Sequence, residues 1–174
     1  MALIVGRTAA AIRAVSPDSP IIFNGMATGP ETSCAYLKKV ETVLGGRLPV
    51  DAIGIHPYTR WATKAPFDWG NQYGTLAQAF EVYRRELPGY KFWITEIGVA
   101  DDNGIGSQFY GEIGDYMKDV YQYVGERGTD LVETLIWFAW SDWMRNAGGG
   151  DAGRRSEGQG VFRIQGSAEP GVVD

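Results

Sequence analysis

The feature that most constrains the fold of this chain is a regular alternation of helical and strand-like segments. Amphipathic stretches predict helices at 2–15, 31–44, 72–87 and 107–127. Short, almost continuously apolar runs follow them and predict strands at 20–26, 50–58, 90–98 and 130–140. Strands that are apolar throughout are typical of parallel sheets covered by helices. The order therefore predicts an α/β fold with a parallel sheet and right-handed crossovers.

Chain length limits how much of such an architecture is present. The 174 residues suit one domain, and 44% of them are hydrophobic, which is enough to form a core. A complete (β/α)8 barrel typically needs about 250 residues. A doubly wound nucleotide-binding sheet is the rival, but it needs a turn of the form G-x-G-x-x-G. The nearest candidate, at 103–106, lacks the third glycine and is interpreted as a plain loop. The Gly-rich remainder, 141–174, contains one further expected strand, at 160–164.

The net charge and the composition limit the kinds of partner and cofactor that the chain is expected to bind. A net charge of −5 argues against nucleic acid or an anionic membrane, and no apolar run approaches the ~18 residues of a membrane span. One histidine and one cysteine, Cys34, make a transition-metal site or another cofactor unexpected. The acidic loop 101–103 lacks the ligand spacing of a calcium loop. The first fifteen residues predict an amphipathic helix rather than a signal peptide, so the cellular location stays open.

Polar and aromatic side chains gather where the predicted strands end. Ligands of parallel barrels and sheets bind at the carboxyl ends of the strands. The residues found there are Asn24, His56, Tyr58, Glu96, Trp140 and Asp142. Because these ends meet at one edge of a parallel sheet, we expect the side chains to surround a common mouth.

Strand alternation predicts which side chains share a face. In the third strand it places Glu96 on the same face as Phe92 and Ile94, opposite Thr95. In the second strand it groups Gly54 with His56 and Tyr58, and in the fourth it groups Ile136, Phe138 and Trp140. On this prediction an apolar row leads up to Glu96 at the mouth.

The residue types in this group are compatible with cleavage of a sugar bond. A carboxylate held at a rigid strand end can attack an anomeric carbon. Tyrosine and histidine can hydrogen-bond to that carboxylate or to sugar hydroxyls, and a Trp ring offers a flat face for a pyranose. Each residue also has a structural interpretation: Glu96 as a surface charge, His56 as a structural histidine and Trp140 as core. Their joint placement at successive strand ends favours the catalytic interpretation.

The segments DAIGIHPY, KFWITEIG and LIWFAWSDW resemble strands six, seven and eight of clan A retaining glycoside hydrolases. These are (β/α)8 enzymes that include cellulase-, xylanase- and β-xylosidase-like families. The resemblance implies that Glu96 is the nucleophile, that Tyr58 hydrogen-bonds to it and that His56 shapes the sugar site. It implies that Trp140, or else Trp137, lies under the sugar. Residues 1–174 would then form a single half-barrel domain, from helix four to the segment before helix eight.

The chain departs from the clan pattern in one large respect. The clan's acid/base glutamate follows an asparagine at the end of strand four, and no Asn-Glu pair occurs in this sequence. A retaining mechanism needs two carboxyl groups about 5–5.5 Å apart, so the chain supplies one of them at most. The expected activity is hydrolysis of β-linked plant-type polysaccharide or oligosaccharide, and it is expected to be weak, dependent on a partner or absent. The alternatives are an inactive carbohydrate-binding relic, one half of a two-chain enzyme, and an unrelated α/β protein with a structural Glu96.

Half a barrel would leave two sheet edges unpaired and an apolar face in water. We expect the inner-face residues Ile53, Ile55, Phe92 and Ile94 each to forgo about 1.5–3 kcal/mol of burial in such a half. By the same resemblance the segment PIIFNG, in the predicted strand 20–26, is strand five. A homodimer repairs the half-barrel if strand eight of one copy pairs with strand five of the other, closing eight strands about a two-fold axis. Asp142 of the second copy would then approach the position of the missing acid/base.

Overall fold

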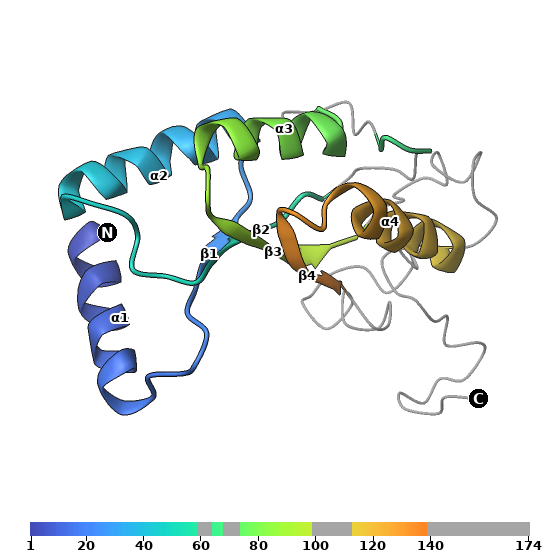
Figure 1. Cartoon of the computed structure of the whole chain (residues 1–174). Helices are drawn as coiled ribbons and strands as arrows, with labels where there is room; N and C mark the ends of the chain where they lie inside the picture. Colours follow the sequence, from blue (N-terminus) through green and yellow to red (C-terminus); the bar gives the residue numbers. More distant parts are fainter. Residues whose placement is uncertain (59–63, 68–73, 99–112, 139–174) are drawn as a thin grey trace, which may run out of the picture.

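In the computed structural model, residues 1–58, 64–67, 74–98 and 113–138 are described. Their elements alternate along the chain (Figure 1). They are α1 (Ala2–Val15), β1 (Ile22–Met26), α2 (Pro30–Leu44), β2 (Ala52–Ile55), α3 (Leu76–Glu86), β3 (Lys91–Ile97), α4 (Ile113–Arg127) and β4 (Val132–Trp137). The predicted element order is confirmed for this part of the chain. The strand expected at 160–164 and the predicted start of the last helix, at 107, lie outside the described residues.

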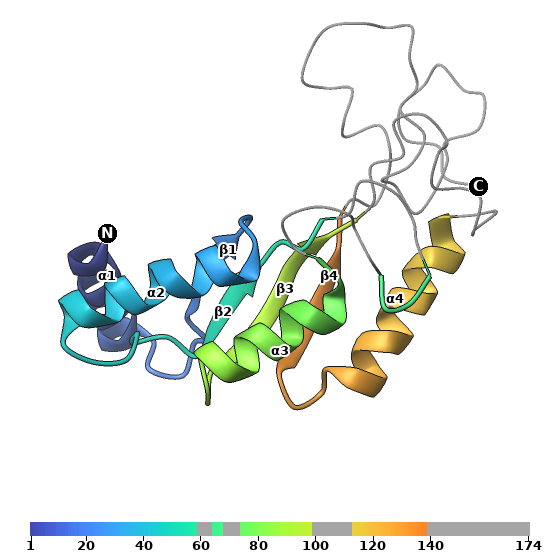
Figure 2. The ribbon, with the colours of Figure 1, turned by 90° about the horizontal axis from the view of Figure 1, so that it is seen from above.

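The four strands form one parallel sheet in the order β1-β2-β3-β4. Every neighbouring pair of strands is joined through a helix, as a parallel sheet requires. Figures 1 and 2 show α1 at the β1 end of the molecule and α4 at the β4 end, with α2 and α3 between them. This α/β arrangement is compatible with half of a (β/α)8 barrel.

Local sequence signals explain where two helices begin and end. Thr75 caps α3: its hydroxyl accepts from the Gln78 amide at 3.0 Å, and the Gln78 side chain accepts from the Thr75 amide at 2.9 Å. This reciprocal capping box starts the helix at Leu76 instead of the predicted residue 72. Helix α2 ends at Gly45, whose φ of 73° is the left-handed conformation that glycine adopts without steric cost.

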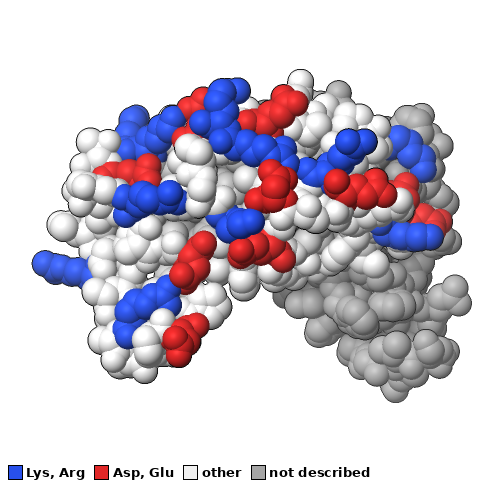
Figure 3. Space-filling model, viewed as in Figure 1, with Lys and Arg blue, Asp and Glu red and all other residues white. Residues whose placement is uncertain are grey.

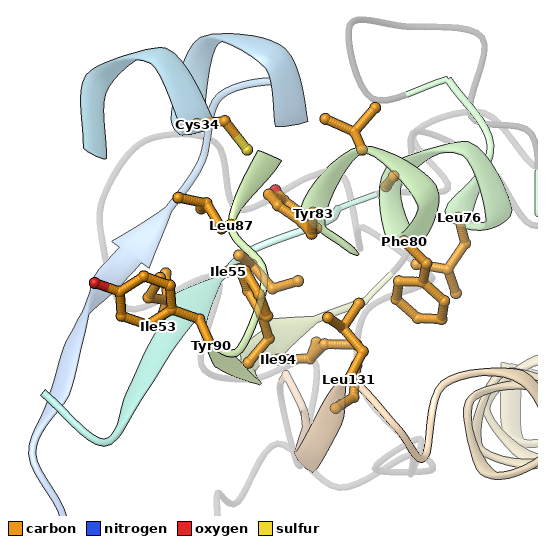
Figure 4. Close-up of a cluster of buried hydrophobic side chains, with 14 of the residues drawn as sticks. Cys34, Ile53, Ile55, Leu76, Phe80, Tyr83, Leu87, Tyr90, Ile94 and Leu131 are labelled. Carbon is orange, nitrogen blue, oxygen red and sulfur yellow. The ribbon is translucent and has the colours of Figure 1, made fainter. Parts of the chain in front are cut away.

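The buried core lies between the sheet and its helices (Figure 4). In-register side chains form continuous rows across the strands on this side of the sheet, for example Ile55 beside Ile94 and Ile53 beside Phe92. These four side chains are at most 1% exposed, and the Phe92 ring packs on Tyr83 of α3 at 4.6 Å. The prediction that they line the open inner face was therefore wrong, because they face the helices and are already buried.

The opposite face of the sheet carries a different set of residues. Gly54, Trp93 and Thr134 are in register across β2, β3 and β4. Trp93 is half-buried, and its Nε1 donates to Glu133 at 3.3 Å. Ile136, further along β4, is 46% exposed. Within the described part of the chain, the unburied face is thus mixed in character and not a row of large aliphatic side chains.

Two β-bulges break the alternation just before the strand ends. Phe23 and Met26 of β1 are three residues apart, while their partners Ile53 and Ile55 are two apart. Likewise Ile94 and Ile97 of β3 pair with Leu135 and Trp137. Each bulge inserts one extra residue, so the two residues inside it both leave the buried row. In β3 those residues are Thr95 and Glu96.

The outer surface of α2 and α3 carries alternating charges (Figure 3). Lys38 donates to Glu86, and Arg85 Nε donates to the same carboxylate at 2.7 Å. These two hydrogen bonds, Lys38 first, lower the pKa of Glu86 from 4.5 to about 2. Because folding lowers this pKa, the carboxylate stabilises the native state above its unfolded pKa, and that contribution is lost as pH falls toward 2.

We therefore expect Glu86→Gln to be less stable than the wild type at pH 6, by the small amount typical of exposed ion pairs. The difference should shrink between about pH 4.5 and 2. Urea unfolding of both proteins across this pH range measures it. A difference that stays constant down to pH 2 would contradict the assignment.

Candidate active site at the strand ends

Glu96 is held at the end of β3 by a tyrosine that follows the neighbouring strand β2. The Tyr58 hydroxyl donates to Glu96 Oε2 at 2.7 Å, while the carboxylate side chain remains 41% exposed. Burial raises the pKa of Tyr58, and the hydrogen bond to Glu96 and the negative charge of Glu96 raise it further. Tyr58 therefore stays protonated and acts as a permanent donor to one oxygen of an accessible carboxylate.

His56 lies between the two residues of the β3 bulge. Its Nε2 shares a hydrogen bond of 2.9 Å with Thr95 Oγ1, and its Nδ1 lies 3.9 Å from Glu96 Oε2. Strict alternation would have placed Thr95 and Glu96 on opposite faces, yet both reach the same imidazole ring. The prediction that Glu96 shares a face with Phe92 and Ile94 was wrong, since the bulge moves it to the side of His56.

Glycines make room for these side chains. A Cβ on Gly25, inside the β1 bulge, would lie 1.9 Å from His56 Nε2. A Cβ on Gly98 would lie 2.4 Å from the Phe138 carbonyl oxygen and 3.5 Å from the Tyr58 ring. The roles of these two glycines and of Thr95 were not predicted from the sequence. A glycine next to the end of an apolar strand was the available signal, because it marks a bulge or a close approach of backbone.

The two aromatic residues at the end of β4, Trp137 and the following Phe138, lie on different sides of the sheet. Phe138 is 36% exposed, and its ring meets Tyr58 edge to face, with 6.1 Å between centroids. Trp137 packs against the core, with Tyr116 of α4 at 6.0 Å, and its buried Nε1 has no hydrogen-bond partner among the described residues. Trp137 therefore lies with the helices and away from Glu96, whereas Phe138 borders the site.

Of the predicted site residues not yet placed, Asn24 alone lies in the described part of the chain. Asn24 is exposed in the β1 bulge. Trp140 and Asp142 lie outside the described residues. In the described ranges, no three His, Cys, Asp or Glu side chains are grouped as a metal site requires. What the structure brings together is one accessible carboxylate, a tyrosine donor and a histidine fixed by a threonine.

This arrangement is suited to nucleophilic chemistry at one oxygen of Glu96. Tyr58 engages Oε2, and no described residue donates a hydrogen bond to Oε1. A carboxylate held on one side and open on the other can present its second oxygen to an electrophile.

None of the helices in the described part of the chain is long and apolar enough to cross a membrane. In comparisons with known proteins, no family model and no curated protein matches the chain.

Proposed function

We propose that this chain is half of a retaining glycoside hydrolase barrel of the clan A type, with Glu96 as its nucleophile. The observation that carries the proposal is the hydrogen bond of 2.7 Å from Tyr58 to Glu96 Oε2 at the carboxyl end of a parallel strand. His56 and Thr95, which are hydrogen-bonded to each other beside Glu96, support it. The substrate class is a β-linked plant-type polysaccharide or oligosaccharide.

In the proposed reaction, Glu96 Oε1 forms a bond to the anomeric carbon while the bond to the leaving oxygen breaks. The leaving group takes the electron pair, and Tyr58 keeps Oε2 oriented and hydrogen-bonded throughout. Water then attacks the anomeric carbon of the glycosyl-enzyme and gives up one proton to the solvent, while the bond from that carbon to Glu96 Oε1 breaks and the carboxylate is regenerated. The first step needs a proton donor for ordinary sugars, whose leaving alkoxides are strong bases.

No residue of this chain matches the proton donor of the clan, since the sequence holds no Asn-Glu pair. We propose that four further strands complete an eight-stranded barrel, supplied by a second copy in a homodimer, and that Asp142 of that copy approaches the leaving group. Activity on natural glycosides is then weak or depends on assembly. Aryl glycosides whose leaving groups need no proton should react at Glu96 directly.

The test is covalent trapping. Dinitrophenyl glycosides with fluorine in place of the hydroxyl next to the anomeric carbon form glycosyl-enzymes that hydrolyse slowly. We expect the intact mass of the wild type to rise by one fluorosugar, on a peptide containing Glu96, with at least one of the gluco, xylo, manno or galacto compounds. Glu96→Gln should show no such adduct, and Glu133→Gln, an exposed strand carboxylate, should label normally. Absence of label with all four sugars, or label on another residue, would overturn the nucleophile.

The absent acid/base favours a second candidate, a carbohydrate-binding half-barrel that no longer turns over. It would keep the aromatic and polar rim made by Tyr58 and Phe138 but not the reaction. It predicts that oligosaccharides shift the amide or tryptophan signals of the protein while the fluorosugars leave its mass unchanged. Binding without an adduct would therefore select this candidate over the enzyme.

A further inference from the structure

Tyr58 carries the hydroxyl that holds Glu96, yet its own backbone lies beyond the end of a strand. β2 ends at Ile55, and the Tyr58 amide donates to the His56 carbonyl at 2.9 Å instead of to a neighbouring strand. The place of the hydroxyl therefore depends on what surrounds the tyrosine side chain. Glu96 accepts from the hydroxyl at 2.7 Å, and two other rings meet the Tyr58 ring edge to face.

One of these two rings belongs to Phe138, whose backbone is joined to the strand that carries Glu96. The Phe138 amide donates to the Ile97 carbonyl at 2.8 Å, and a Cβ on Gly98 would lie 2.4 Å from the Phe138 carbonyl oxygen. Ile97 and Gly98 are the two residues that follow Glu96. Because Trp137 packs on the core, alternation places the next side chain, Phe138, on the opposite side of the sheet, with Glu96.

The contacts of Glu96, Tyr58 and Phe138 therefore close on themselves. Glu96 accepts from Tyr58, the Tyr58 ring packs on Phe138, and the Phe138 backbone is bonded to the residue after Glu96. The two ring centroids are 6.1 Å apart and the ring planes are 86° apart. Aromatic rings attract one another in this edge-to-face arrangement, so the contact restrains the orientation of the tyrosine ring.

We propose that Phe138 is a positioning residue that acts on the nucleophile through Tyr58. Its ring keeps the Tyr58 hydroxyl directed at Glu96 Oε2. The inference rests on the proposed function, because it gives this hydroxyl a part in the second step of the reaction. When water displaces Oε1 from the sugar, negative charge returns to the Glu96 carboxylate, and a donor already directed at Oε2 stabilises that charge.

The test measures the rate at which water releases the fluorosugar from labelled Glu96. We expect Tyr58→Phe to slow this release about tenfold to a hundredfold, because the donor is lost. Phe138→Leu should slow it about twofold to tenfold, the factor that corresponds to the loss of one aromatic pair. Phe138→Tyr keeps the ring and should release the sugar about as fast as the wild type. Ile136→Ala, a truncation at an exposed position on the same face of β4, is the matched control.

The double variant separates positioning from direct contact with the sugar. In the Tyr58→Phe background no hydroxyl is left to be directed, so Phe138→Leu should cause no further slowing. A further slowing of the same size would mean that the Phe138 ring touches the sugar itself, and it would overturn the inference. Release at the wild-type rate in the single variant Phe138→Leu would overturn it as well.

A second measurement needs no sugar. Urea unfolding of the wild type, the two single variants and the double variant gives the coupling between Phe138 and the Tyr58 hydroxyl. If Phe138 supports the hydrogen bond to Glu96, the double variant should lose less stability than the sum of the two single losses, whereas additive losses contradict the inference. A chain that shows this coupling but never labels at Glu96 refutes only the nucleophile. A chain that labels at Glu96 but shows additive losses refutes only the role of Phe138.

Discussion

Ile94→Ala is expected to lower the free energy of unfolding by about 2–5 kcal/mol, whereas Ile136→Ala should change it by less than about 0.5 kcal/mol. Ile94 is fully buried in β3 and lies in the core cluster beneath the helices. Truncation there removes buried methyl groups and leaves a cavity that its packed neighbours fill only in part. Ile136 is the same residue type in the adjacent strand but is 46% exposed, so the same truncation removes little buried area.

The pair of variants tests which face of the sheet is buried. Urea unfolding followed by tryptophan fluorescence measures both, at a protein concentration low enough to keep the chain monomeric. Equal losses at the two positions, or a larger loss at Ile136, would mean that the sheet buries its other face. The glycosidase proposal would then fail, because the position of Glu96 is defined relative to the same rows of buried strand residues.

The fold was largely predictable because its determinants are local and repeated. Apolar runs about as long as one strand, separated by amphipathic segments, leave a parallel sheet as the simplest arrangement, and the order of elements follows from it. The α3 start could have been found as well, since Thr75 and Gln78 have the spacing of a capping box. Barrel closure could not be predicted in the same way, because it depends on contacts beyond one copy of the chain.

The residues of the site could be predicted from the sequence, but the face of the sheet on which each of them lies could not. His56, Tyr58 and Glu96 were found because they follow buried strands, and the structure places them together. Alternation then gave the wrong neighbours for Glu96, since a bulge inserts one residue and reverses every face after it. Strict alternation had tied Ile94 to Glu96, so overlooking the bulge also placed Ile94 on the open face. A bulge is set by pairing across strands, and a single strand's sequence shows only hints of it.

Gly25 is the residue whose replacement should disturb the site most directly. A Cβ at this position would lie 1.9 Å from His56 Nε2 and about as close to the neighbouring ring carbons. Because the contact is with an aromatic ring held by Thr95, the imidazole must leave its place and give up the 2.9 Å hydrogen bond. We expect Gly25→Ala to lower the free energy of unfolding by about 1–3 kcal/mol. Labelling of Glu96 by activated fluorosugars should slow in the same variant.

A double-mutant cycle with His56→Ala shows whether the clash is the cause. In the His56→Ala background the ring is gone, so Gly25→Ala should cost close to nothing, giving a coupling energy of about 1–3 kcal/mol. Gly46→Ala is the control, since its Cβ would meet no atom within 4 Å. Additive effects of Gly25→Ala and His56→Ala would mean that the glycine is needed for the strand bend alone. Gly25 would then have no part in orienting His56. The hydrogen bond with Thr95 would be what orients the His56 ring toward Glu96.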